Sequence, residues 1–132
     1  MLQDQEQQSG KDHAPVKTIL VVEDDTDIGM LIDAVISAET SYQTLWVTDG
    51  LQALKVVQDT KPDMFLLDYF LPLMDGIELY DRLHALKELE TIPTVMMSAR
   101  LPTKEIEKRK ILGLRKPFEL QELLDMIERL LP

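Results

Sequence analysis

The sequence predicts an α/β fold in which one doubly wound, five-stranded parallel sheet carries helices on both faces. Two observations and one general rule lead to this prediction. Short apolar runs, the form taken by strands buried on both faces, alternate along the chain with segments of helical periodicity. The connections between these segments are short. Right-handed crossovers then distribute the helices over both faces of a single sheet.

Five apolar runs are the predicted strands. They span residues 18–22, 43–47, 64–67, 94–97 and 111–114. At this domain size the usual arrangement is the flavodoxin-like (βα)5 fold with strand order 2-1-3-4-5. That order places the first run beside the third, with the topological switch point between them.

A helix is expected after each run. Thr26 is the expected cap of the first helix, Asp49–Gly50 opens the second, and Gly76 begins the third. Residues 120–131 show the clearest helical spacing of apolar side chains. Residues 103–110 are mostly charged with one apolar residue, which predicts a weak, shortened fourth helix.

Residues 17–132 are expected to form one domain, because this length supports a core without metals or disulfides. Residues 1–16 are polar, show no periodicity and are predicted to be a disordered tail. The chain has no cysteine, which excludes disulfides and thiolate metal sites. No apolar stretch is long enough for a membrane span or a signal peptide, so we expect a cytoplasmic protein without a membrane partner.

Polar residues end four of the five predicted strands. They are Glu23 and Asp24 after the first, Asp68 after the third, Ser98 after the fourth and Lys116 after the fifth. Ligands of open α/β sheets bind at this edge. Any one of these residues alone is a normal turn residue, but five of suitable chemistry at four strand ends indicate a site. We expect Asp25, beside them, to be solvated.

The chemistry of these side chains favours a cation and a phosphoryl group. Three converging carboxylates repel one another unless a positive charge lies between them, and hard oxygen ligands suit Mg²⁺. Lys116 and Ser98 would then neutralise and bind a phosphoryl group on Asp68. The net charge of −10 argues against nucleic acid as a partner.

The chain from about Val16 to Pro132 resembles the receiver domain of two-component response regulators. The matching segments are, in order, ILVVEDD at 19–25, PDMFLLDYFLPLMDG at 62–76, IPTVMMSA at 92–99 and RKPF at 115–118. As a set in this order they are specific to the family. The resemblance implies a signalling domain that assists its own phosphorylation and dephosphorylation, and is not a conventional enzyme.

The resemblance also implies a role for each site residue. Asp68 would be the phosphoacceptor, taking its phosphoryl group from a sensor histidine kinase or a histidine phosphotransfer protein. Asp24, Asp68 and the backbone carbonyl of Phe70 would bind Mg²⁺, with Glu23 binding through water or directly. Ser98 would bind a phosphoryl oxygen, and Lys116 would contact the phosphate from a typically cis Lys116–Pro117 bond.

The match departs from the family pattern between the fourth and fifth strands. Lys116 follows Ser98 by 18 positions, a few fewer than is usual in the family, and the missing residues fall around the fourth helix. The aromatic residue that the family carries three positions before the lysine is replaced by Gly113. Two interpretations follow: intact phosphoryl chemistry with output through another surface, or a partly degenerate, phosphorylation-independent interaction module.

Because all five chemical residues are present, we favour a single-domain receiver. The chain ends after its last helix, so the signal is expected to pass by contact with an unknown downstream protein or by onward phosphotransfer. A phosphatase of the haloacid-dehalogenase type needs a second aspartate where Phe70 stands. A flavodoxin-like FMN protein needs a phosphate-binding loop where the acidic pair stands. His84, among charged helix residues, is expected to be solvated.

Overall fold

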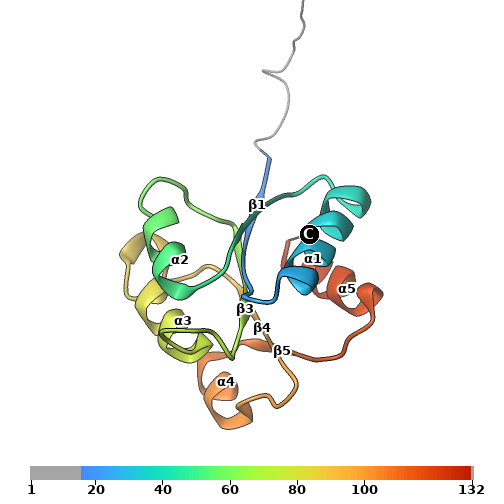
Figure 1. The fold of residues 1–132 in the computed structure, drawn as a ribbon. Helices are drawn as coiled ribbons and strands as arrows, with labels where there is room; N and C mark the ends of the chain where they lie inside the picture. Colours follow the sequence, from blue (N-terminus) through green and yellow to red (C-terminus); the bar gives the residue numbers. More distant parts are fainter. Residues whose placement is uncertain (1–15, 132) are drawn as a thin grey trace, which may run out of the picture.

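The computed structural model describes residues 16–131, and almost all of the predicted disordered tail, residues 1–16, lies outside this range. The described chain forms one parallel five-stranded sheet with the predicted order β2-β1-β3-β4-β5 (Figure 1). The strands are β1 (Thr18–Val22), β2 (Gln43–Val47), β3 (Met64–Asp68), β4 (Thr94–Ser98) and β5 (Leu112–Arg115). The fifth strand lies one residue later than predicted.

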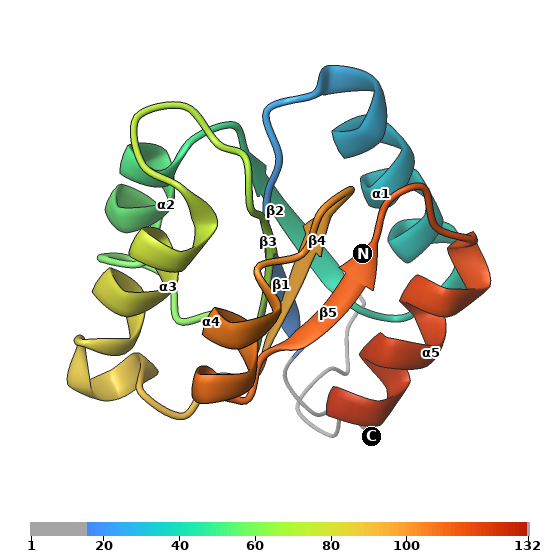
Figure 2. The same ribbon diagram turned by 90° about the horizontal axis from the view of Figure 1, so that it is seen from below.

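Helices cover both faces of the sheet, as predicted. They are α1 (Thr26–Glu39), α2 (Gly50–Val56), α3 (Gly76–His84), α4 (Thr103–Arg109) and α5 (Leu120–Leu130), with a short 3₁₀ turn at Lys87–Leu89. Helices α1 and α5 lie on one face, and α2, α3 and α4 lie on the other (Figure 2).

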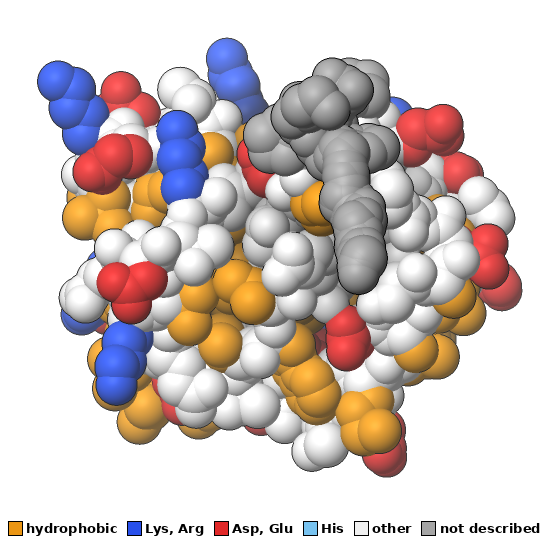
Figure 3. Space-filling view, turned by 90° about the horizontal axis from the view of Figure 1, so that it is seen from above, with side chains coloured by type: hydrophobic (Ala, Val, Ile, Leu, Met, Phe, Trp, Pro, Cys, Tyr) orange, Lys and Arg blue, Asp and Glu red, His pale blue; other side chains and the backbone are white. Residues whose placement is uncertain are grey.

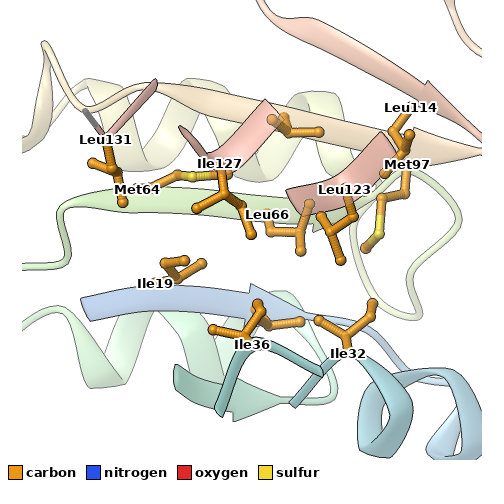
Figure 4. Packing of buried hydrophobic residues seen from close by; sticks show 12 residues of the cluster. Ile19, Ile32, Ile36, Met64, Leu66, Met97, Leu114, Leu123, Ile127 and Leu131 are labelled. Atoms are coloured by element: carbon orange, nitrogen blue, oxygen red, sulfur yellow. The ribbon is translucent and has the colours of Figure 1, made fainter. Parts of the chain in front are cut away.

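The sheet separates two apolar cores, because successive side chains of a strand point to opposite faces. In β1, Ile19 and Val21 pack toward α1 and α5, as Figure 4 shows for Ile19, while Leu20 and Val22 pack toward α2 and α3. All five residues of β3 are buried. Burial on both faces explains why the first four residues of this central strand, 64–67, are an unbroken apolar run.

The fourth helix has only seven residues, as the shortened connection predicts, but it is firmly attached. Its Arg109 donates to both carboxylate oxygens of Asp81 on α3, at 2.8 and 2.9 Å, and to Glu105 at 2.8 Å. Its single apolar residue, Ile106, is buried beside β5. Ile106 and Arg109 therefore attach this mostly charged helix to β5 and α3.

The prediction that His84 is solvated was wrong. Its ring stacks on Tyr80 at a centroid distance of 3.8 Å and meets the edge of Phe65. Its Nδ1 and Nε2 lie 3.0 and 2.9 Å from the carbonyl oxygens of Tyr80 and Ile92. The neighbouring charged residues misled the prediction, because His84 lies on the side of α3 that packs over the sheet.

Charged and apolar side chains are mixed on the side of the molecule shown in Figure 3, without a broad basic patch. Among the described residues, no helix combines the length and apolar character needed to cross a bilayer.

Candidate functional site

The carboxyl ends of the strands bring the predicted site residues to one edge of the sheet. The loops that follow β1 and β3 both lie at the upper edge of Figure 2. The pairing of Val22 with Leu67 places Glu23 and Asp24 next to Asp68. The pairing of Asp68 with Met97, one residue before Ser98, brings in the end of β4.

Glu23, Asp24 and Asp68 form an acidic cluster, in which one carboxylate oxygen from each residue lies within 4.8 Å of the others. The Glu23 side chain is buried and Asp68 is 4% exposed, whereas Asp24 faces solvent. Buried carboxylates at this spacing are costly unless positive charge compensates them.

Lys116 supplies one such charge. Its Nζ lies 2.7 Å from Glu23 Oε1 and 3.1 Å from Asp68 Oδ1. The lysine is placed by the end of β5, where its backbone N–H donates to the Ser98 carbonyl at 2.9 Å and the Lys116–Pro117 bond is cis. Burial lowers the pKa of Lys116, but the contacts with Glu23 and Asp68 outweigh burial and raise it overall. The lysine is therefore a fixed cation.

One lysine does not balance three carboxylates. Burial and the neighbouring Glu23 raise the pKa of Asp68 to about 6, even though Lys116 opposes this shift. A bound divalent cation would offset both the burial and the repulsion between the carboxylates, since it favours the ionised form of nearby carboxylates. The donors are hard oxygens with one open side at exposed Asp24, which fits Mg²⁺ with part of its hydration shell retained.

Ser98 lies buried at the end of β4, in the predicted place. Its hydroxyl accepts a hydrogen bond from Arg100 N–H at 3.1 Å and donates to the Arg100 carbonyl at 2.9 Å. The hydroxyl is thus bonded to the turn after β4. Binding a phosphoryl oxygen would require it to exchange these local hydrogen bonds.

Phe70 lies in the loop after β3, with its ring 62% exposed and its edge against Tyr69. Its carbonyl oxygen accepts no hydrogen bond from the residues that the structure describes. A free carbonyl in the loop next to Asp68 is compatible with the metal-ligand role expected for it.

Two residues near the site were missed or misjudged from the sequence. Asp25 is exposed, as expected, but it is also the N-cap of α1 in place of Thr26: its side chain accepts from Ile28 N–H at 3.0 Å. Its backbone N–H also donates to Glu23 Oε2 at 3.1 Å. Trp46 on β2 donates its indole N–H to the Glu23 carbonyl at 2.9 Å. The Asp-x-x-Ile spacing could have revealed the cap, but nothing in the sequence linked Trp46 to the acidic pair.

Comparison with known proteins agrees with this geometry. The family model of the response regulator receiver domain matches residues 19–128. The chain belongs to this family. It is 37% identical over 118 residues to sporulation initiation phosphotransferase F of Bacillus subtilis, covering 86% of this chain and 93% of the relative. It is also 37% identical to the phosphate regulon transcriptional regulatory protein PhoB of Pseudomonas aeruginosa, covering 87% of this chain and 52% of that protein.

Solved structures of receivers share the fold. The chemotaxis response regulator CheY4 of Vibrio cholerae matches with a TM-score of 0.81 and 25% identity, covering 89% of this chain and all of that one. The receiver domain of a Pseudomonas aeruginosa sensor histidine kinase matches with a TM-score of 0.77 and 26% identity, covering 87% and 97%. That second structure contains a magnesium ion in the active-site cleft.

Proposed function

We propose that this receiver domain accepts a phosphoryl group on Asp68 from a phospho-histidine of a sensor histidine kinase or a histidine phosphotransfer protein. The observation that carries the proposal is the contact of Lys116 Nζ with both Asp68 and Glu23 beside the acidic cluster. It supports a nucleophilic role for Asp68, because a buried carboxylate, a lysine cation and two further carboxylates lie together at one edge of the sheet.

The transfer is an in-line displacement at phosphorus. An oxygen of the ionised Asp68 attacks the phosphorus atom, and a P–O bond forms as the P–N bond to the donor imidazole breaks. The electron pair of that bond stays on the ring nitrogen, which takes a proton from water. The products are an acyl phosphate on Asp68 and a free histidine on the donor.

Glu23, Asp24, Asp68 and the Phe70 carbonyl are the residues that would hold Mg²⁺, and the ion would supply positive charge to the phosphoryl oxygens. Lys116 would contact a phosphoryl group on Asp68, and its Nζ, 3.1 Å from Asp68 Oδ1, supports this role. Ser98 would donate its hydroxyl to a phosphoryl oxygen after leaving Arg100. These groups act mainly by position and charge, as is usual for phosphoryl transfer.

Only the similarity to known proteins supports an inference about how the signal is passed on. The similarity to a phosphotransferase, across 93% of that protein, supports onward transfer of the phosphoryl group from Asp68 to another protein. The chain spans about half the length of the transcriptional regulatory protein PhoB that it matches. On the strength of the similarity to the phosphotransferase, we propose that the signal passes to another protein.

Incubation with acetyl phosphate and Mg²⁺, followed by intact-protein mass spectrometry, tests the proposal. We expect a gain of one acid-stable phosphoryl group, absent without Mg²⁺ and absent in Asp68→Asn. Asp63→Asn is the matched control: Asp63 lies at the opposite end of β3 and accepts a hydrogen bond from Thr18 N–H at 2.8 Å. This variant should be phosphorylated like the wild type. If the wild type shows neither phosphorylation nor Mg²⁺ binding, the phosphorylation-independent module is favoured instead.

A further inference from the structure

Trp46 is the only tryptophan of the chain and belongs to β2, a strand at the edge of the sheet that contributes none of the expected ligands. Its indole Nε1–H donates to the Glu23 carbonyl oxygen at 2.9 Å. That carbonyl is part of the peptide unit joining Glu23 to Asp24. The hydrogen bond therefore fixes the orientation of the peptide plane from which Asp24 extends.

Every polar group of Glu23 makes a hydrogen bond. Its N–H donates to the Val47 carbonyl at 3.1 Å, and its carbonyl accepts from Trp46. Its carboxylate oxygens accept from Lys116 and from the backbone N–H of Asp25. The Asp24 carboxylate, by contrast, has no hydrogen-bond partner within residues 16–131. Its direction depends on the backbone that Trp46 holds.

The indole ring is itself fixed by close packing against α1. A Cβ atom at Gly29 would lie 2.2 Å from both Cε2 and Cζ2 of Trp46, a separation that atoms cannot adopt. Gly29 also donates its N–H to the Asp25 carbonyl at 2.9 Å. The ring thus lies against the first turn of α1, directly after the Glu23–Asp25 turn, and cannot move toward the helix.

We propose that Trp46 is a positioning residue of the cation site: it orients the Glu23–Asp24 peptide so that the Asp24 carboxylate converges with Glu23 and Asp68 before a cation binds. This inference rests on the proposed function, because it needs Mg²⁺ to bind to the acidic cluster. A preorganised ligand loses less conformational freedom on binding, so removal of the indole donor weakens Mg²⁺ binding without removing a ligand.

The variant Trp46→Phe keeps an aromatic ring against Gly29 and loses the N–H donor. The net contribution typical of one hydrogen bond corresponds to about a fivefold change in an equilibrium constant. We expect the dissociation constant for Mg²⁺, measured by isothermal titration calorimetry, to rise about fivefold. The Mg²⁺ concentration for half-maximal phosphorylation by acetyl phosphate should rise by the same factor, while the rate at saturating Mg²⁺ stays within about twofold of wild type.

Thr44→Val is the matched control. Thr44 lies two residues before Trp46, on the same side of the same strand, and its hydroxyl donates to Asp33 of α1. This variant also removes one side-chain hydrogen bond between β2 and its surroundings, but away from the acidic cluster. We expect wild-type Mg²⁺ affinity for Thr44→Val. Equal weakening in both variants, or no weakening in Trp46→Phe, would overturn the inference.

A measurement on the wild-type protein avoids any folding defect of the variants. A single tryptophan gives a single indole N–H resonance in a ¹⁵N–¹H correlation spectrum. That resonance should shift during a Mg²⁺ titration and saturate at the affinity found by calorimetry. If calorimetry shows Mg²⁺ binding but the resonance does not move, the positioning role of Trp46 is wrong. If the wild type binds no Mg²⁺ at all, the proposed cation site and this inference fail together.

Discussion

In the metal-free protein, the burial of Asp68 opposes the ionisation of its carboxyl group. It is 4% exposed, and burial together with Glu23 raises its pKa to about 6 from the ordinary 3.8. The folded state therefore binds a proton at Asp68 more tightly than the unfolded chain does. Through this group, stability is lost as pH rises from about 4 to about 6, and above that range the fold carries the full cost of an ionised Asp68.

Asp68→Asn should accordingly stabilise the metal-free protein at pH 7.5. A neutral side chain of the same shape removes the buried charge while Lys116 keeps its contact with Glu23. We expect the free energy of unfolding, from urea denaturation in EDTA, to rise by about 1–3 kcal/mol. The gain should shrink as pH falls from about 6 to about 4. Asp63→Asn should show no such gain, and a destabilised Asp68→Asn at pH 7.5 would contradict the linkage.

The sequence predicted the charged residues of the site because the fold itself brings strand ends together. Asp68 and Lys116 are far apart in the chain, yet parallel strands necessarily bring their carboxyl ends to one edge. Two residues whose environment was missed, Trp46 and His84, make contacts that leave no pattern in the sequence. Trp46 bonds to a backbone carbonyl, and the environment of His84 depends on which side of α3 packs over the sheet.

At the scale of elements, α4 and β5 show what replaces the aromatic residue expected at Gly113. A Cβ atom there would lie 2.8 Å from Leu101 Cδ1 and 3.0 Å from Ile106 Cδ1. The two aliphatic side chains occupy the space above the strand, and Arg109 holds α4 to Asp81 of α3. The sequence revealed the missing aromatic residue, but the side chains that fill its place follow only from the packing of α4.

Gly113→Phe should therefore destabilise the fold, although it restores the type of residue that the family carries. A ring on this side of β5 must displace Leu101 and Ile106, and overpacking of this kind typically costs about 1–3 kcal/mol. Gly113→Ala should change stability much less, because the methyl group meets only the ends of two flexible side chains. Urea denaturation measures both effects.

Leu112→Phe provides the control for Gly113→Phe, since Leu112 is half-buried on the opposite face of the same strand. It adds a ring to β5 without touching the contact with α4. We expect a smaller loss than for Gly113→Phe. An unchanged free energy of unfolding in Gly113→Phe would mean that α4 moves aside easily, and that the space above Gly113 is open to a side chain after all.

For the whole molecule, the main electrostatic feature is an excess of negative charge, −10 over the chain, with three carboxylates gathered at one edge of the sheet. Any salt screens the general repulsion. A cation bound between β1 and β3 acts differently, because it links the two strands at the switch point and is released on unfolding. The two effects can be separated by comparing salts at equal ionic strength.

Mg²⁺ should stabilise the fold by mass action beyond this screening. At a concentration 100 times its dissociation constant, a ligand that binds only the folded state adds about 2.7 kcal/mol, which for a chain of this size raises Tm by about 10 °C. NaCl at matched ionic strength should raise Tm only slightly, and EDTA should abolish the Mg²⁺ effect. Asp24→Asn should fold normally, since Asp24 is exposed, but lose most of the Mg²⁺-specific increase. Equal stabilisation by the two salts would show that the acidic cluster responds to ionic strength alone and holds no specific cation.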